Sequence, residues 1–280
     1  MDIQSELTKQ VFEKYVPAVK SPEHNDSVYN RLKGQFALSY NALLAEIISP
    51  ELAAQAEAQD LIKQQMLRWV SIHTFVAQAR ALDLVLTATG FGIVNTESTA
   101  PASQERVNSL IAQEQLELVT VRTVIAVQML GIEGWGATVQ AGNCIDALLW
   151  NSSEIWAGTI LRPSIDEWFK VTARIQMAEN VLRGVISDEY MEELLQKMRT
   201  NNLENADIII VNKCKAFTFD YINRYDETKG LFNRRLLDDV MLQLETYTDS
   251  YPTYVDSKVY AAKHSERYEN KREDPTFFFM

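Results

Sequence analysis

The sequence has few of the residues that interrupt or cross-link a fold. Its 280 residues include 10 glycines, 7 prolines, 2 cysteines and 3 histidines. Glycine and proline together (17 of 280) make up about 6 % of the chain, roughly half the usual ~12 %, which favours long helices with few breaks. Cys144 and Cys214 show no CxxC spacing and have no histidine nearby, so a disulfide framework and a structural zinc site are both disfavoured. We interpret both cysteines as small buried side chains.

The chain also lacks an excess of basic charge and a long apolar run. Lys and Arg number 27 against 38 Asp and Glu, and the formal charge of −11 argues against a general basic face that grips nucleic-acid phosphates. An apolar fraction of 46 % argues against disorder. The best apolar stretch, residues 119–132, contains Arg122 and Gln128, and the first residues do not resemble a signal peptide. We therefore expect a protein that is made in the cytoplasm, stays soluble and does not enter a membrane.

Motifs for catalysis and cofactor binding are missing. None of the histidines, at positions 24, 73 and 264, belongs to an HExxH or Glu-x-x-His pattern. Gly90-Phe91-Gly92 and Gly134-Trp135-Gly136 lack the third glycine of a dinucleotide fingerprint, and neither GxxxxGK[ST] nor GxSxG occurs. We predict no enzyme, no catalytic residue, no cofactor and no metal. His73 is interpreted as a helix residue with a local partner.

Apolar residues at helical spacing and capping signals predict a mainly α protein, a multi-helix bundle. In the segment Ser49-Pro50-Glu51, Ser49 is expected to cap a long helix that continues to Leu82. Ser103 and Ser187 mark further helix starts. Helices are predicted over residues 3–16, 28–48, 51–82, 103–130, 163–181, 187–198, 205–225 and 233–247.

Two segments are expected to interrupt this helical body. Residues 84–95 are β-branched and apolar around two glycines, which predicts a small β-hairpin. Four of the ten glycines fall at positions 131, 134, 136 and 142, so a subdivision of the body is expected at about residues 131–143. The body is assigned to residues 1–262, and residues 263–280 are predicted to form an extended C-terminal arm.

Aromatic residues suggest two contact regions. Trp150, Trp156 and Trp168 lie within nineteen residues and pack between two helices or form a partner-binding surface. In the arm, Phe277, Phe278 and Phe279 follow a stretch of residues 263–274 with four basic and four acidic side chains. Such an end either folds back or docks on a neighbouring subunit, for example as an added strand. Because the arm is balanced in charge, the −11 belongs to the helical body.

Several motifs together resemble one protein family. Gly90-Phe91-Gly92-Ile93-Val94 and Pro101-Ala102-Ser103-Gln104-Glu105-Arg106-Val107 resemble its "GFGVV … PAS-x-x-RV" signature. Its central region resembles Leu161-Arg162-Pro163-Ser164-Ile165, Ile186-Ser187-Asp188-Glu189-Tyr190 and Leu194-Leu195, and its aromatic end resembles Tyr268-Glu269-Asn270-Lys271 with Phe277-Phe278-Phe279. The resemblance spans about residues 84–280. The family comprises uncharacterised helical proteins of Bacteroidetes genomes, prophages and crAss-like gut phages, regarded as virion neck components.

The resemblance implies a structural virion protein, a head–tail connector or neck ring subunit that joins the portal to the tail. Its implied partners are further copies of itself in a homo-oligomeric ring, the portal and other neck or tail proteins. Duplex DNA would pass an acidic channel without specific binding. Candidate contact residues are Phe277, Phe278, Phe279, Phe91, Trp156 and Trp168. The family has no catalytic residues, and the implied location is the virion neck.

Two other functions stay open on the sequence. One is an intracellular helical adaptor whose tryptophan-bearing face binds a single protein partner. The other is an enzyme whose site assembles from scattered residues around the break at residues 131–142, which would require a pocket with clustered ionisable side chains.

Overall fold

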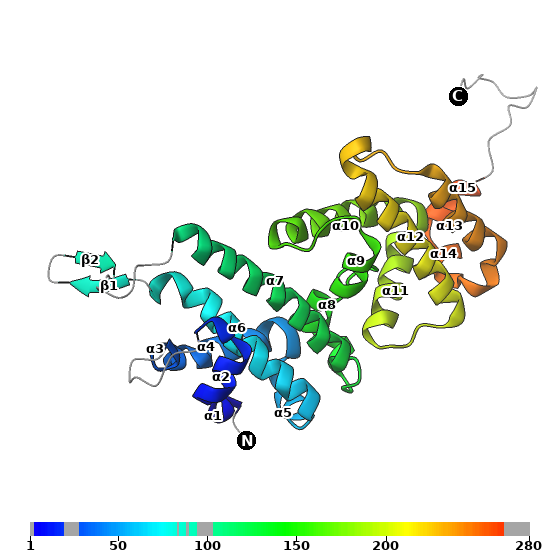
Figure 1. The fold of residues 1–280 in the computed structure, drawn as a ribbon. Helices are drawn as coiled ribbons and strands as arrows, with labels where there is room; N and C mark the ends of the chain where they lie inside the picture. Colours follow the sequence, from blue (N-terminus) through cyan, green and yellow to red (C-terminus); the bar gives the residue numbers. More distant parts are fainter. Residues whose placement is uncertain (1–2, 20–27, 83, 88–89, 94–102, 266–280) are drawn as a thin grey trace, which may run out of the picture.

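The computed structural model describes residues 3–19, 28–82, 84–87, 90–93 and 103–265. Almost all of this part is helical, which confirms the predicted mainly α class. Figure 1 shows two groups of helices, α1–α7 and α10–α15, with α8 and α9 between them. The first group contains α1 (Ile3–Glu6), α2 (Lys9–Tyr15), α3 (Val28–Leu32), α4 (Phe36–Leu43), α5 (Ala53–Glu57), α6 (Asp60–Leu82) and α7 (Gln104–Met129).

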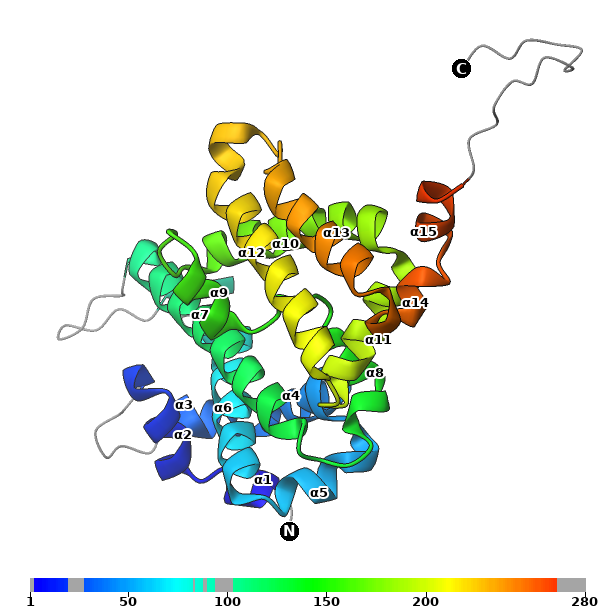
Figure 2. The same ribbon diagram turned by 90° about the vertical axis from the view of Figure 1, so that its right-hand side faces the viewer.

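In the second half of the chain, the other helices pack around the long α10 and α12 (Figure 2). Its elements are α8 (Val139–Cys144), α9 (Ser152–Gly158), α10 (Ile165–Ile186), α11 (Asp188–Arg199), α12 (Asn205–Thr228), α13 (Arg234–Thr246), α14 (Pro252–Val255) and α15 (Lys258–Lys263). Single 3₁₀ turns cover residues 17–19, 33–35, 50–52, 135–137 and 248–250, and a π-helical turn covers Leu44–Ile48.

Two helix starts follow directly from the sequence. The Ser103 hydroxyl accepts a hydrogen bond from the Arg106 N–H (3.4 Å), and the Ser187 hydroxyl accepts one from the Tyr190 N–H (3.1 Å). Each bond satisfies one of the free N–H groups in the first turn of its helix. The predicted starts of α7 and α11 are therefore confirmed.

The predicted cap at Ser49 is wrong. Ser49 has a φ of +84°, and its side chain makes no capping bond to the helix that follows. Its hydroxyl instead donates to the Glu51 carboxylate. The hydroxyl is thus directed at this carboxylate and not at the N–H groups of the first turn, from which an N-cap accepts. The positive φ alone does not prevent capping, because Ser187 has a φ of +122° and still caps its helix. The single helix predicted over residues 51–82 is accordingly divided into a 3₁₀ turn, α5 and α6.

The predicted helices over residues 3–16 and 28–48 are also divided. Thr8 caps a new helix, α2, by accepting a bond from the Val11 N–H (3.3 Å). A 3₁₀ turn that includes Gly34 separates α3 from α4, and the π-helical turn follows α4 without a break. Such local changes in hydrogen-bond spacing do not alter an apolar pattern enough to be read from the sequence.

Outside the helices, β1 (Leu84–Thr87) pairs antiparallel with β2 (Gly90–Ile93). Leu84 lies opposite Ile93, and Thr87 lies opposite Gly90. The pair lies inside the segment 84–95 for which a hairpin is predicted, and residues 88–89 and 94–95 lie outside the described residues. So do residues 266–280 of the predicted arm, whose first residue, Lys263, is the last residue of α15.

The glycine-rich segment at residues 131–143 is anchored to the first group of helices. Trp135 is fully buried, and its Nε1–H donates to the carbonyl of Ile47 (2.8 Å). Gln140 and Cys144 reach the two preceding carbonyls, of Ala45 (3.1 Å) and Glu46 (3.9 Å). Carbonyls at the end of a helix have no partner within it, so these three side chains satisfy groups that the π-helical turn leaves free.

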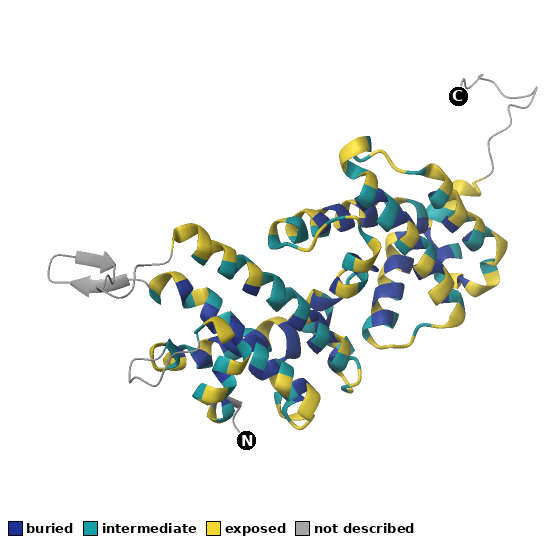
Figure 3. Cartoon of the chain, in the orientation of Figure 1, coloured by how far each residue is buried: buried dark blue, intermediate teal, exposed yellow. Residues whose placement is uncertain are grey.

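Buried side chains form one large core and one small cluster. Figure 3 shows that buried residues lie in both groups of helices. The large core runs through both groups of helices and includes Trp135. Both cysteines are buried and unpaired, as predicted. The small cluster lies between α9, α10 and α12 and the segment before α9; its buried members are Ala147, Leu149, Ile155, Val171, Ile175 and Ile222. This small cluster supports the surface described next.

Candidate interaction surface

Two of the six predicted contact residues lie together in the structure. Trp156 of α9 and Trp168 of α10 have ring centroids 5.8 Å apart, with their planes inclined by 50°. Both are half-buried and pack against the small cluster. Of Phe91 only the backbone is described, in β2, and Phe277, Phe278 and Phe279 lie outside the described residues. Each tryptophan ring therefore packs between helices on one side and is exposed to a possible partner on the other, so both roles predicted for the pair are compatible with the structure.

A groove lies beside this pair, between α7, residues 143–150 and α10. Its volume is about 270 Å³. We call it the α7–α10 groove. Trp168 and Phe169 line it from the start of α10, and Phe169 is 63 % exposed. An aromatic side chain left this exposed in the lining of a groove is typical of a contact site. Further lining residues are Thr123, Ala126, Leu149, Trp150 and Thr172.

Two charged side chains of opposite sign lie in the groove. Arg122 of α7 is exposed and donates to the Asn143 carbonyl (2.6 Å). The Asp146 carboxylate accepts a bond from the Gln176 amide (3.3 Å). Burial raises the pKa of Asp146 from its ordinary value, opposed by a hydrogen bond from its own backbone and by the charges of Arg122 and Arg199. The groove is therefore lined by polar and charged side chains as well as by apolar ones.

The thiol in the groove is not activated. Burial raises the pKa of Cys144, and the nearby guanidinium of Arg122 offsets this only in part. A thiol with a raised pKa is a poor nucleophile, because the thiolate is the reactive form. The groove thus has the chemistry of a binding surface more than that of a nucleophilic site.

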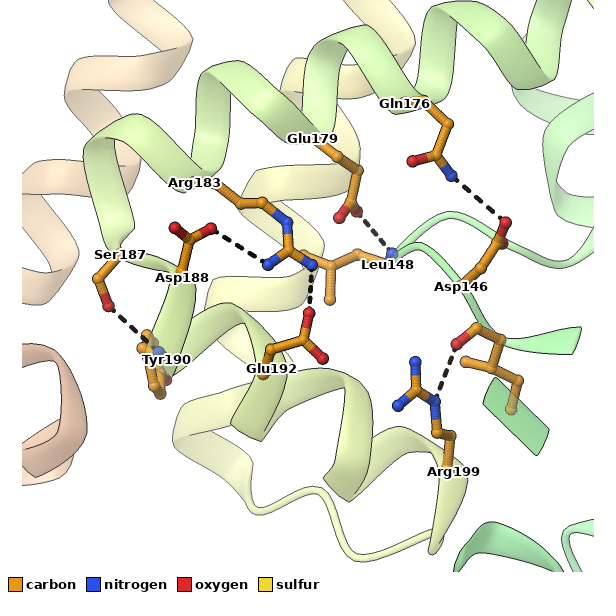
Figure 4. A network of polar contacts seen from close by, with 11 residues as sticks. Asp146, Leu148, Gln176, Glu179, Arg183, Ser187, Asp188, Tyr190, Glu192 and Arg199 are labelled. Atoms are coloured by element: carbon orange, nitrogen blue, oxygen red, sulfur yellow. Dashed lines mark hydrogen bonds and ion pairs between the residues drawn. The ribbon is translucent and has the colours of Figure 1, made fainter. Parts of the chain in front are cut away.

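Polar side chains hold the segment that forms one wall of the groove (Figure 4). Arg199 of α11 donates to the Ile145 carbonyl (3.0 Å), and Glu179 of α10 accepts a bond from the Leu148 N–H (2.7 Å). Together with the bond from Gln176 to Asp146, they fix residues 145–148 against α10 and α11. This wall is therefore held in place before any partner binds.

Glu179 is the unusual member of this network. It is 2 % exposed, and its second carboxylate oxygen, Oε2, has no hydrogen-bond partner in the part of the chain that the structure describes. Burial raises its pKa to about 7, against a lowering by the Leu148 N–H and by the charge of Arg183. Arg183 itself pairs with Asp188 (3.3 Å) and Glu192 (2.6 Å). A buried carboxyl at the base of the groove wall was not among the residues predicted from the sequence.

The position of Glu179 relative to neighbouring apolar residues could have indicated from the sequence that it is buried. It lies four residues after Ile175 and three before Leu182, both fully or nearly fully buried. Residues at these spacings share one helix face, so an acid on an otherwise apolar face marks a buried carboxyl. By contrast, the groove itself joins α7 to α10 across more than forty residues of chain, and no local pattern indicates that pairing.

His73 has a local partner, as predicted. Its Nδ1 lies 2.9 Å from the Ser39 hydroxyl, and its ring stacks on Trp69 with centroids 4.4 Å apart. Burial lowers the pKa of His73, with Glu46 acting in the opposite direction. Within the described ranges, no group of three or more His, Cys, Asp or Glu side chains is arranged to hold a metal ion. No helix among those residues is long and apolar enough to cross a membrane.

The loop between α9 and α10 presents an exposed apolar side chain on a fixed backbone. The Asn223 amide donates to the Gly158 carbonyl (3.0 Å) and accepts from the Ile160 N–H (3.1 Å). One turn earlier on the same helix, Phe219 packs directly on Gly158. Ile160 is 79 % exposed at this loop. The Trp156–Trp168 pair and Ile160 thus belong to one supported surface.

Replacing Gly158 by alanine is expected to destabilise the protein by about 1–3 kcal/mol, the usual cost of overpacking. A Cβ at this position would overlap the Phe219 ring, so the ring must move away from the small cluster. The matched control is Gly184→Ala in α10, where a Cβ meets nothing within 4 Å. That change is expected to stabilise the protein by up to ~1 kcal/mol through helix propensity. Urea unfolding followed by circular dichroism measures both, and equal effects of the two substitutions would contradict the packing argument.

The fold and this surface define a mainly helical protein with a pre-formed, aromatic-lined groove. Residues 17–118 match a family described as "Family of unknown function (DUF6712)". The match covers α3–α6, both strands and the first half of α7, and includes the glycine and PAS motifs of residues 90–107. The groove, whose lining begins at Val119, lies outside the matched residues. No curated protein and no solved structure matches the chain.

Proposed function

We propose that this protein is a non-catalytic structural subunit of a virion neck, a head–tail connector that assembles as a homo-oligomeric ring. The observation that carries the proposal is the coexistence, in one chain, of an aromatic-lined groove and an arm that ends in three phenylalanines. In a ring, one patch of each subunit contacts a different patch of the next, so a groove and an arm supply the two halves of one repeated contact. The resemblance over residues 84–280 supports the same function.

The charge of the protein fits a channel through which DNA passes. A formal charge of −11, located in the helical body, repels phosphates and does not hold the duplex. The proposed partners are further copies of the chain, the portal, and other neck or tail proteins. The proposed location is the neck of the virion, after synthesis in the host cytoplasm.

A helical adaptor that binds one protein partner is the second candidate. The half-buried Trp156–Trp168 pair beside the exposed Phe169 favours it, because aromatic side chains of this kind supply most of the binding energy in many interfaces. The two candidates differ in self-association. A ring subunit forms a closed oligomer of defined size, alone or on its portal, and an adaptor does not.

The test is assembly of the full-length chain with and without its terminal aromatic residues. We expect the wild-type chain to form rings, seen by electron microscopy and light scattering, alone or with the portal protein from the same genome. The variant Phe277→Ala/Phe278→Ala/Phe279→Ala should keep the same circular dichroism spectrum and fail to assemble. Rings of normal size from that variant, or a monomeric wild-type chain with the portal supplied, would overturn the proposal. A gene position beside portal, capsid and tail genes is the expected genomic context.

A further inference from the structure

We infer that the α7–α10 groove is the acceptor site for the phenylalanines at positions 277–279. The inference rests on the proposed function for one point, that the phenylalanines come from a neighbouring copy. The size, lining and charge of the groove and the reach of the arm support the groove as the acceptor.

The size of the groove suits aromatic rings. A cavity of roughly 150 Å³ with apolar walls holds one benzene molecule. The groove, at about 270 Å³, has room for one ring and at most two. In an extended chain the side chains alternate, so Phe277 and Phe279 share one face about 6.6–6.8 Å apart, and Phe278 points to the other. Either Phe277 and Phe279 together or Phe278 alone therefore enters the groove. The two arrangements predict crosslinks to the groove from different positions.

The lining supplies partners for such rings. Trp168 and the exposed Phe169 lie on the α10 side, and Trp150 lies on the opposite segment. Aromatic rings contact each other favourably in tilted or offset arrangements, with centroids about 4.5–7 Å apart. The Trp156–Trp168 pair already has this geometry behind the groove. An inserted phenylalanine would extend it and cover Phe169.

Charge complementarity fixes the direction of the chain. In the arm, Glu273 and Asp274 lie three to four residues before Phe277. At the groove, Arg122 is exposed and donates to the backbone carbonyl of Asn143. A carboxylate of the arm beside Arg122 would gain a charge-assisted hydrogen bond. The acidic residues would then lie at the edge of the groove and the phenylalanines within it.

The arm is long enough to reach. Lys263, at the end of α15, donates to the Val185 carbonyl of α10 (3.0 Å), so the described chain ends beside the C-terminal part of that helix. The groove lies 9 to 17 residues earlier on α10, at Trp168–Gln176, which is about 14–26 Å along the axis. Phe277 follows Ser265 by twelve residues, which span up to about 40 Å when extended. The same length allows exchange between adjacent copies.

Photocrosslinking in the full-length protein tests the inference. With p-benzoylphenylalanine at position 277, 278 or 279, we expect crosslinks to residues 119–126, 143–150 or 168–176 from one of the two alternating sets only. The same probe at position 232, where Phe232 is exposed on another part of the molecule, should give none of these crosslinks. Mixing isotope-labelled and unlabelled protein shows whether each crosslink joins two copies or forms within one.

Two groove variants give the quantitative readout. Thr172→Trp fills the groove and should lower the crosslink yield about tenfold, the effect of losing one anchor residue. Met177→Trp is its matched control, because Met177 is exposed on the same helix and does not line the groove. If Thr172→Trp does not fold, Phe169→Ala replaces it, because that side chain is mostly exposed and its loss costs the fold little.

The outcomes separate the inference from the proposed function. Groove crosslinks between copies support both. Groove crosslinks within one copy support the acceptor site and overturn the ring contact. Assembly that needs the phenylalanines but gives no groove crosslink, or is unaffected by Thr172→Trp, overturns the acceptor site and leaves the proposed function standing.

Discussion

Replacing Trp135 by alanine is expected to lower the free energy of unfolding by about 3–5 kcal/mol, the range for deleting a large buried aromatic side chain. Trp135 has no exposed surface and packs in the core that joins the two groups of helices. Its indole also donates to the carbonyl of Ile47 at the end of the π-helical turn (2.8 Å). Alanine removes the packing and the hydrogen bond together. Urea unfolding of the full-length chain, followed by circular dichroism, measures the loss.

Trp135→Phe separates these two contributions. Phenylalanine keeps a buried ring and removes the donor, so the Ile47 carbonyl loses its partner at an expected cost of about 1–3 kcal/mol. The control is Val139→Ala in the nearby α8, because Val139 is 74 % exposed and its truncation should change stability by less than ~0.5 kcal/mol. A loss for Trp135→Ala as small as that of the control would mean that residues 131–143 do not join the two groups of helices.

The glycine pattern of residues 131–143 predicts a break in the helices but not the contacts that anchor this segment. Four glycines within twelve residues indicate a break in the helices, and the structure has turns and two short helical pieces there. The pattern does not reveal that Trp135 and Gln140 satisfy carbonyls nearly ninety or more residues earlier in the chain. Those carbonyls are free because of the π-helical turn at Leu44–Ile48, and a single π turn leaves no trace in an apolar pattern.

Local chemistry could be predicted and distant pairing could not. The sequence predicts helix starts at Ser103 and Ser187, and both are confirmed, because a cap is decided by a side chain and the three residues after it. Ser49 also stands before an acidic first turn and makes no capping bond, because its hydroxyl donates to the Glu51 carboxylate instead. For the candidate site, the grouping of tryptophans pointed to Trp156 and Trp168. The groove beside them depends on α7 meeting α10, which only packing determines.

Stability is expected to depend on pH through Glu179, with the protein more stable near pH 5 than near pH 8. Burial raises the pKa of this carboxyl from 4.5 to about 7. Between these values the folded chain binds a proton at Glu179 that the unfolded chain has released, so the free energy of unfolding falls as the pH rises. The full contribution is on the order of 3 kcal/mol, from 1.36 kcal/mol for each unit of pKa difference. Above pH 7 a buried negative charge therefore remains in the folded protein.

Glu179→Gln tests this contribution directly. Glutamine keeps an oxygen that accepts from the Leu148 N–H and carries no charge, so we expect about 1–3 kcal/mol of added stability at pH 8 and almost none at pH 5. Arg183, Asp146, Glu192 and Cys214 face the site electrostatically, so the informative quantity is the difference between variant and wild type at each pH. Glu192→Gln is the control, because it removes an exposed partner of Arg183 and should cost less than ~1 kcal/mol. Parallel stability profiles of Glu179→Gln and wild type from pH 5 to pH 8 would show that Glu179 is not the source. If the two stability profiles differ at pH 8 and converge towards pH 5, Glu179 is the source of the pH dependence. The residue that holds the wall of the groove would then also make stability depend on pH.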